Sequence, residues 1–402
     1  MTLTLNNFVG FETGGLEEAS SLNNNPLVQS GVVRTGAFAL QLGGSGLLKR
    51  FNVGLLGTDA GDKYIAGFAF RTTDKNPGSQ NGPFTARDTN NIGIIGLRLK
   101  PNGDVHITDV SFNDVAMVTD PFTVNIWHYI ELIWENTNAG SAELFIDGLS
   151  VASVASADFD TGLAISDYRL RGPGSTEGTY YFDDVYLYSG AADSDDRLGN
   201  NTEVLGAYQN TVEDALDQGD ALEAGTWAIT GDSPGVDDGT PAQYTSTPRD
   251  GHTICDEGAR PGPFTAGEGT GIIKGGKWLH RLRRSSGGGT THSIRYGHNG
   301  DTVLETVTLD TSYENFITIK DNTVAQVPTS SEDFAQGFKV DGPRSIECAD
   351  MWAFLLHVDE ALPPPPPGPS RNLANSRSHV QPQRAFVFNP REKAFTRGHA
   401  ET

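Results

Sequence analysis

Two carboxylates, Glu131 and Glu135, lie four residues apart in the stretch IWHYIELIWE, which begins at Ile126. Side chains four residues apart on a β-strand share a face, so a strand here would present both carboxylates together. Hydrolysis of a glycosidic bond needs two carboxyl groups about 5 to 10 Å apart, one as the acid and one as the base or nucleophile. Midway between them stands Ile133, and the stretch holds no third carboxylate. We therefore expect both to be solvated, and we predict no catalytic residue and no enzymatic activity.

Four other aspartates could bind a metal ion. Asp183 and Asp184 are adjacent, so on a regular strand they would point to opposite faces and could not both hold one ion. Asp104 and Asp147 each stand beside a glycine in a turn-like sequence, and either could join backbone carbonyls in a calcium site. The nine histidines show no spacing typical of a zinc site. We predict no metal and no other cofactor, with calcium at Asp104 or Asp147 as the alternative.

Aromatic residues could stack against a sugar ring without any hydrolysis. The candidate carbohydrate-binding residues are Trp127, Tyr129, Tyr180 and Tyr181. Aromatic residues at strand spacing usually pack in a core instead. For Trp127 and Trp134 we favour the core, and glycan binding stays an alternative.

Two basic segments could bind a partner. Residues 277–284 carry Arg281 and Arg283 on one strand face and further polar residues on the other, which indicates an edge strand or an interface, or else a solvated edge protected by charge. After the prolines at 363–367, the C-terminal segment has six basic and two acidic residues, giving +4. We expect this arm to bind an acidic neighbour, although a disordered tail is the alternative. Its candidate contacts are Arg384, Phe386, Phe388 and Arg391.

Period-two patterns predict the strands that would position these side chains. The stretch Ile126–Asp147 predicts a β-hairpin, with alternation up to Trp134, a turn at 136–140 and a return strand. Residues 74–89 are rich in Asn, Pro, Gly and Asp and predict a loop. The other predicted strands of the first half are 37–42, 64–71, 92–99, 105–107, 168–171 and 180–188. Those of the second half are 276–284 and 291–296, joined as a hairpin, then 303–309, 315–319 and 351–358.

Several of these segments resemble a known family. The segments GFETG, RTGAFALQL and ELFIDG resemble strands of a concanavalin A-like, or laminin G-like, jelly roll, and YYFDDVYLY resembles its terminal strand, which returns beside the first. The segments LHRLRRSSGGGTTHSIRYG, LDTSYENF and IECADMWAFLLHVD resemble a module that follows such domains in proteins of tailed bacteriophages. Glucanases of this fold carry Glu-x-Asp-x-Glu on one strand, and here Ile133 stands at the central position. The resemblance therefore implies a virion component rather than an enzyme.

The length of 402 residues favours more than one domain, and 48 glycines with 9% aromatic residues favour β-sandwiches. We predict an all-β chain with two tandem antiparallel β-sandwiches and an extended C-terminal arm. The expected parts are a concanavalin A-like sandwich at 1–189, a connector at 190–226 with one short helix at 211–222, a second sandwich at 227–360, and a Pro-rich spacer and arm at 361–402. Cys255 and Cys348 are too few for a disulfide framework, and one bridge or two free thiols stay open.

A formal net charge of −22 argues against nucleic-acid binding, which needs a basic surface. No apolar run is long enough for a membrane span, and no secretory leader is visible. We therefore expect a structural component of a bacteriophage virion, assembled in the host cytoplasm and held by contacts with other virion proteins and copies of itself. Capsid decoration, tail fibre and baseplate all stay open. The alternative is a carbohydrate-binding adhesin or lectin that recognises host-surface glycans.

Overall fold

The structure is a computed structural model of the 402-residue chain. It describes residues 3–11, 16, 21–23, 26–43, 48–56, 62–75, 81–174, 178–190, 194–208, 242–244, 249–255, 272–284, 291–296, 303–312, 314–321, 334–340 and 346–358. Met1–Glu360 form one compact unit and Ala361–Thr402 a second. The predicted connector helix and the predicted arm contacts lie outside the described residues.

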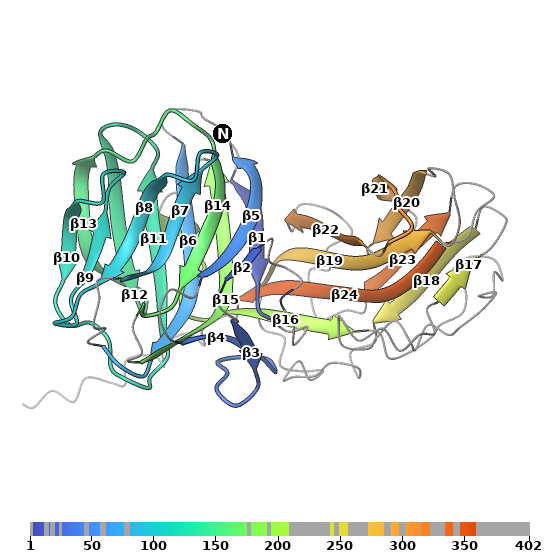
Figure 1. The fold of residues 1–402 in the computed structure, drawn as a ribbon, viewed down its shortest axis with the longest axis horizontal. Helices are drawn as coiled ribbons and strands as arrows, with labels where there is room; N and C mark the ends of the chain where they lie inside the picture. The colour runs from blue at the N-terminus through green and yellow to red at the C-terminus, as the bar shows by residue number, and fades with distance from the viewer. Residues whose placement is uncertain are drawn as a thin grey trace, which may run out of the picture. The chain divides into compact units, whose positions relative to one another are not determined.

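Within the described residues the chain forms four antiparallel sheets, which confirms the predicted all-β class. Sheet A contains, in sheet order, β13 (Leu149–Ala157), β12 (Gly140–Ile146), β11 (His128–Glu135), β6 (Lys63–Thr72), β15 (Thr179–Gly190), β4 (Ala39–Gly43) and β3 (Leu27–Gln29), with β1 (Thr4–Val9) paired to β15. Sheet B contains β10 (Asp114–Val118), β9 (Val105–Thr108), β8 (Gly93–Leu99), β7 (Asn81–Asp88), β14 (Ile165–Arg171), β5 (Leu48–Leu56) and β2 (Ser21–Asn23). The two sheets form the layers of the first β-sandwich (Figure 1).

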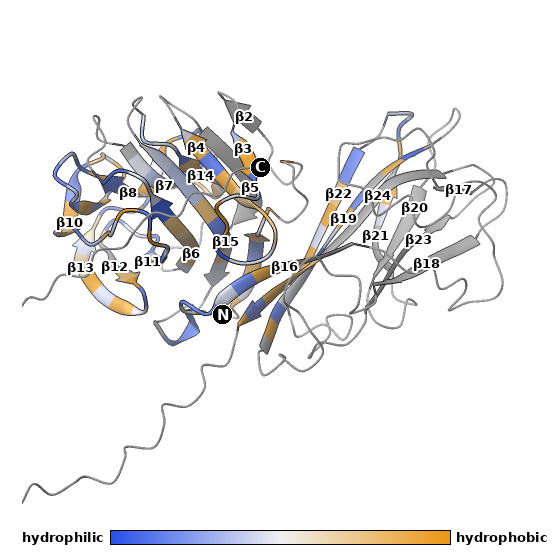
Figure 2. Cartoon of the chain, turned by 90° about the horizontal axis from the view of Figure 1, so that it is seen from below, coloured by the Kyte–Doolittle hydropathy of each residue, from blue (hydrophilic) through white to orange (hydrophobic). Residues whose placement is uncertain are grey.

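The predicted hairpin organises the core between sheets A and B. Strands β11 and β12 pair antiparallel with Trp134 opposite Ala142, as the alternation predicts. Trp134 is fully buried and stacks on Tyr64 with 5.3 Å between ring centroids. The terminal strand β15 returns beside β1, as the resemblance implies. Bands of hydrophilic and hydrophobic residues follow one another along the coloured strands of this sandwich (Figure 2).

The second half forms sheets C and D. Sheet C contains β16 (Thr202–Tyr208), β24 (Ile346–Val358), β19 (Ile272–Arg284) and β22 (Glu314–Asp321), with β17 (Ala242–Tyr244) paired to β24. Sheet D contains β18 (Arg249–Cys255), β23 (Phe334–Val340), β20 (Thr291–Tyr296) and β21 (Val303–Thr308). The helical content of the described residues is one 3-10 turn, η1 (Ser194–Asp196). Among these residues no helix has the length and apolar character needed to cross a membrane.

Four predictions about elements are wrong. Strand β19 lies between β24 and β22, so the basic segment 277–284 is central in its sheet and not an edge. Strands β19 and β20 belong to different sheets, so they do not form the predicted hairpin. The predicted loop 74–89 contains β7, a central strand of sheet B. Strand β16 lies inside the predicted connector and pairs with β24, so the second group of sheets begins by Thr202.

Sheet A carries apolar residues on both faces, because sheet B packs against one face and strands of sheet C pack against the other. The residues of β6 alternate between the core shared with sheet B and a second cluster that contains Ile65 and Ala69. That second cluster also contains Val204 of β16, Leu279 of β19 and Phe354 of β24. The face of sheet A that points away from sheet B is therefore covered by strands of sheet C.

One glycine makes room for a large ring of the second cluster. A Cβ atom at Gly67 would lie 2.0 Å from the ring of Tyr186, which is fully buried in the second cluster. Tyr186 is the cross-strand partner of Gly67 in sheet A, so a side chain at position 67 would displace the ring that lies across this strand.

Candidate functional site

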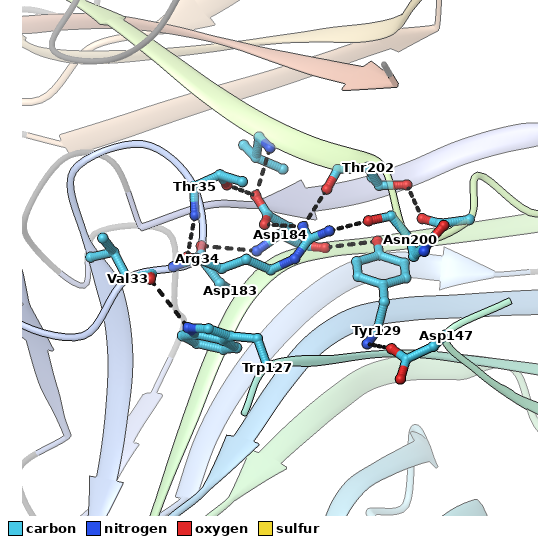
Figure 3. A network of polar contacts seen from close by, with 12 residues as sticks. Val33, Arg34, Thr35, Trp127, Tyr129, Asp147, Asp183, Asp184, Asn200 and Thr202 are labelled. Atoms are coloured by element: carbon cyan, nitrogen blue, oxygen red, sulfur yellow. Dashed lines mark hydrogen bonds and ion pairs between the residues drawn. The ribbon is translucent and has the colours of Figure 1, made fainter. Parts of the chain in front are cut away.

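Two adjacent carboxylates on β15, Asp183 and Asp184, are fully buried. The pairing of β15 with β6 is irregular here and Asp184 has a φ of 47°, so both side chains reach Arg34 and Thr35 instead of pointing to opposite faces. Asp183 accepts hydrogen bonds from the backbone N–H groups of Arg34 at 3.1 Å and Thr35 at 3.5 Å. Asp184 accepts from Thr35 Oγ1 at 2.6 Å, the Arg34 guanidinium at 2.6 Å and the Val204 N–H at 2.7 Å (Figure 3).

The guanidinium of Arg34 joins this pair to the segment that leads into β16. It donates to the carbonyl of Thr202 at 2.5 Å and to the carbonyl of Asn200, and it lies 4.9 Å from the ring centroid of Tyr129. Burial acts to lower the pKa of Arg34, but the charge and hydrogen bond of Asp184, together with Tyr129 and Asp183, outweigh burial and leave the pKa raised. We name Arg34, Asp183 and Asp184 the Arg34 clamp. The members of the clamp bind one another and the backbone of Thr202 and Val204, so the clamp holds β15 to β16.

Glu131 is the second buried carboxylate group, and the expectation that it is solvated is wrong. Its side chain is 1% exposed. It accepts hydrogen bonds from the Tyr186 hydroxyl at 2.5 Å, the Arg197 guanidinium at 3.0 Å and the Gly199 N–H at 2.9 Å. Burial first, and then the charge of Glu131, raise the pKa of Tyr186 well above its ordinary value. Glu131 thus fastens the segment after β15 to sheet A, while Glu135 stays half-buried on the same strand.

The predicted carbohydrate-binding aromatics divide into two groups. Tyr129 and Tyr180 are 2% and 0% exposed, so neither offers a ring face to a sugar, which corrects the prediction for these two. Trp127 is half-buried and donates from its indole nitrogen to the carbonyl of Val33 at 3.1 Å. Tyr181 is half-buried, with the Arg71 guanidinium 5.8 Å from its ring centroid. The structure does not bring Trp127 and Tyr181 together with the two buried tyrosines as one exposed site.

The two calcium candidates lie in separate turns. Asp104 accepts hydrogen bonds from Asn102 Nδ2 at 2.6 Å and from the Asp120 N–H at 3.2 Å. Asp147, with a φ of 51°, binds His128 Nδ1 at 2.7 Å and accepts from the Tyr129 N–H at 2.8 Å. Over the described ranges, no group of three or more His, Cys, Asp or Glu side chains could hold a metal ion. Both aspartates are therefore placed as turn residues.

The predicted partner-binding strand contacts the first sandwich through Lys277. Its ammonium group is buried, donates to the carbonyl of Phe8 at 2.5 Å, and lies 5.3 and 5.5 Å from the ring centroids of Phe8 and Phe354. Arg283 is half-buried with interactions of its own, and the side chain of Arg281 is outside the described part of the structure. The basic strand is thus an internal interface at Lys277, and the proposed external contact at Arg281 and Arg283 stays a prediction.

The face of sheet B that points away from sheet A carries a cluster of charged side chains that the sequence analysis did not predict. Leu97, Leu99 and Ile107 point into the core, so the alternating residues of β8 and β9 point outward. Asp114 lies among them and contacts Arg98 at 3.1 Å, Lys100 at 2.6 Å and His106 Nδ1 at 3.5 Å. Across β7 and β14 the same face carries further arginines. We define the basic face as Arg87, Arg98, Lys100, His106, Phe112, Asp114, Asp167, Arg169 and Arg171.

Phe112 places an aromatic ring on this face. The ring lies over Gly93, where a Cβ atom would approach it to 3.1 Å, and the residue is 48% exposed. Its φ of 61° is unusual for a bulky residue. Asp109 fixes this conformation, since its side chain accepts from the N–H groups of Ser111 at 2.9 Å and Asn113 at 2.8 Å. Arg98 also donates to the carbonyl of Phe112 at 3.1 Å, which ties its guanidinium to the backbone that carries the ring.

A second group of cations lies at the β7 and β14 end of the basic face. Arg169 donates to Asp167 at 2.8 Å and to the side-chain oxygen of Asn91, which also lies near the guanidinium of Arg87. Burial first, and then the charge of Arg169, lower the pKa of Arg171. Among the described side chains, the basic face thus holds five Lys and Arg residues and two carboxylates, of which Arg169 and Asp167 are a buried pair, in a chain whose net charge is −22. Such a face can bind an anionic group and stack a ring, both without covalent chemistry.

One sequence signal could have revealed this face. In the stretch GLRLKPNGDVHIT, the charged residues alternate with Leu97, Leu99, Val105 and Ile107, which is the period-two pattern of a half-buried sheet. The outward residues of these strands are mostly basic, namely Arg98, Lys100 and His106. Phe112 had no comparable signal, because its position depends on the Asp109 turn and on the space above Gly93.

No protein-family model matches this chain, and no curated protein matches it. Its fold is similar to that of solved structures. An endo-β-1,4-glucuronan lyase from the fungus Trichoderma reesei is 16% identical, with a TM-score of 0.33, over 47% of this chain and 96% of that one. Arcelin-5, a lectin-like defence protein from Phaseolus vulgaris, is 10% identical, with a TM-score of 0.33, over 47% of this chain and 99% of that one.

A third solved structure comes from a phage. The carbohydrate esterase of the Shiga toxin-encoding bacteriophage phi24B is 12% identical, with a TM-score of 0.35, over 47% of this chain and 100% of that one. These neighbours are concanavalin A-like jelly-roll proteins, and they include both enzymes and a lectin-like protein. At these identities and TM-scores the comparison carries no functional argument, and the jelly-roll fold over about half of the chain is what they have in common.

Proposed function

We propose that this chain is a non-catalytic protein that binds glycans through the basic face of its first sandwich. The observation that carries the proposal is the ring of Phe112, which is 48% exposed on a sheet face among hydrogen-bonding side chains. Sugar sites combine an aromatic platform with a few fixed polar groups. The other face of the sandwich is occupied, because sheet C and the segment 197–208 cover sheet A.

Two buried carboxylate groups support the non-catalytic part of this proposal. Glu131 and the pair in the Arg34 clamp accept several hydrogen bonds each from within the chain. A general acid or base must reach the substrate within hydrogen-bonding distance, and these groups face other parts of the protein. We test the proposal with a glycan array probed by the full-length protein. Binding to at least one glycan class supports it. Absence of binding to every glycan, at a protein concentration high enough to detect a millimolar Kd, refutes it.

We also propose that the protein is a structural component of a bacteriophage virion, held there by contacts with other virion proteins and with copies of itself. The supporting observation is the contact between the first sandwich and sheet C, where Lys277 and the Arg34 clamp bury charged groups with partners on both sides. These contacts would hold the two parts of the chain together while the arm binds a neighbour. Particle microscopy would locate the protein in the capsid, a tail fibre or the baseplate.

The C-terminal arm gives the test of this assembly role. Its +4 charge would attract an acidic neighbour, and Phe386 and Phe388 would anchor it. Truncation after Glu360 should leave folded, monodisperse protein that incorporates poorly into particles or oligomers. We would measure incorporation by sedimentation of particles assembled with the truncated and the full-length chain. Equal incorporation of both would refute a role for Arg384, Phe386, Phe388 and Arg391 in assembly.

A further inference from the structure

We propose that the basic face recognises acidic oligosaccharides, with Phe112 stacking on a pyranose ring and with Arg98 and Lys100 binding the carboxylate of that sugar. This inference rests on the proposed glycan-binding function and specifies its ligand class. Uronic acid units have both chemical features, a flat ring face and a carboxylate that projects from the ring.

Asp114 shows that Arg98 and Lys100 can serve one carboxylate together. Its two oxygens lie 3.1 Å from an Arg98 nitrogen and 2.6 Å from Lys100 Nζ. Burial acts to raise the pKa of Asp114, but the hydrogen bond from Lys100 and the nearby positive charges lower it, so the site favours a carboxylate in its charged form. The side chains of Asp114, Arg98 and Lys100 are 29%, 20% and 16% exposed, so a ligand can reach them. The carboxylate of a sugar would join Asp114 or replace it.

The charge of the face leaves room for additional anions. Asp114 and Asp167 are its two carboxylates, and five Lys and Arg side chains surround them. A single acidic sugar would be attracted by the excess of positive charge, and an oligosaccharide could place a second carboxylate near Arg87, whereas Arg169 is buried in its ion pair with Asp167. The net charge of −22 means that most of the chain would repel such a ligand, whereas this face would attract it.

The position of Phe112 favours a sugar over a simple anion. Its ring lies over Gly93, which pairs in register with Arg87, and its carbonyl accepts a hydrogen bond from Arg98. The ring therefore lies between the two groups of cations. An anion without an apolar face would gain nothing from a half-exposed phenyl ring, whereas the C–H face of a pyranose would cover it. The strained backbone of Phe112 is consistent with a residue placed for binding.

We test the inference by isothermal titration calorimetry on the full-length protein. The probes are tetragalacturonate, its methyl-esterified form with the same rings but no charge, and poly-glutamate as an anion without sugar rings. The variants are Arg98→Gln and Lys100→Gln, which each remove one positive charge, and Phe112→Ala. Lys100→Gln is included because Arg98 also supports the Phe112 carbonyl. Lys63→Gln on sheet A is the matched control, since it removes the same charge from a different face.

We expect tetragalacturonate to bind at least tenfold more tightly than its ester, Arg98→Gln and Lys100→Gln to weaken it about tenfold each, and Lys63→Gln to leave it unchanged. Phe112→Ala should weaken both sugar forms. Equal affinity for acid and ester, or poly-glutamate binding as tight as tetragalacturonate, would overturn the inference while glycan binding itself stands. No binding of either sugar form would also overturn it. The glycan array then decides separately whether the proposed function fails as well.

Discussion

The Arg34 clamp predicts a large loss of stability on a single substitution. In Arg34→Ala, Asp184 keeps its hydrogen bonds from Thr35 and Val204 but loses its cation while staying fully buried. Removing one partner of a buried ion pair typically costs about 3 to 5 kcal/mol, because the remaining charge is left uncompensated. The Arg34 side chain is 16% exposed, so some water can reach the site. We therefore expect a loss at the lower end, about 3 kcal/mol in the free energy of unfolding.

A double-mutant cycle separates this ion pair from the other contacts of Arg34. Asp184→Asn removes the charge but keeps a side-chain oxygen for the Thr35 and Val204 donors. In Arg34→Ala/Asp184→Asn no buried charge is left at position 184, so we expect the double variant to be more stable than Arg34→Ala alone. The difference from additivity should be about 1 to 3 kcal/mol.

The assay is urea denaturation followed by tryptophan fluorescence, with circular dichroism as the second probe. Trp134 reports on the first sandwich and Trp278 on sheet C, and both are fully buried. A loss below about 1 kcal/mol in Arg34→Ala, or strict additivity in the cycle, would refute our reasoning that a desolvated charge at Asp184 depends on Arg34.

Two further predictions concern stability. Trp134→Ala should destabilise the first sandwich by about 3 to 5 kcal/mol in urea denaturation, because it removes a fully buried ring that stacks on Tyr64; an unchanged midpoint would contradict its place in the core. Burial lowers the pKa of His280 to about 4, whereas the unfolded value is about 6.5. The free energy of unfolding is therefore highest above about pH 6.5 and falls by about 3 kcal/mol as the pH drops toward 4, because the unfolded chain takes up the proton more readily. His280→Gln should show a flatter dependence of stability on pH than the wild type, and parallel profiles would contradict this prediction.

Local alternation predicted which segments form strands, among them β6, β8, β11 and β15. The pairing of Trp134 with Ala142 agrees with the turn predicted at 136–140. The pattern misleads where a polar side chain is buried by a distant part of the chain. Segment 277–284 has polar residues on both sides and so resembled an edge, yet Lys277 is buried because it reaches the carbonyl of Phe8, 269 residues earlier.

The candidate site was harder to predict than the fold, for two physical reasons. Asp183 and Asp184 meet on one side only because the strand is irregular and Asp184 adopts a positive φ, which no spacing rule anticipates. Glu131 is buried because the segment after β15 folds back over it with Arg197. The basic face is different, since its alternation was present in the sequence. Only the structure shows that Phe112 lies on that face.

The most direct test of the central claim is the affinity of one glycan for Phe112→Ala. The ligand would be the best binder from the array, and the control is Leu149→Ala, which removes a side chain that is 71% exposed at the turn between β12 and β13. Stacking on an aromatic platform predicts at least a tenfold weaker binding for Phe112→Ala, with Leu149→Ala unchanged and both variants as stable as the wild type. Equal glycan affinity of Phe112→Ala and the wild type would contradict the assignment of the basic face as the binding site.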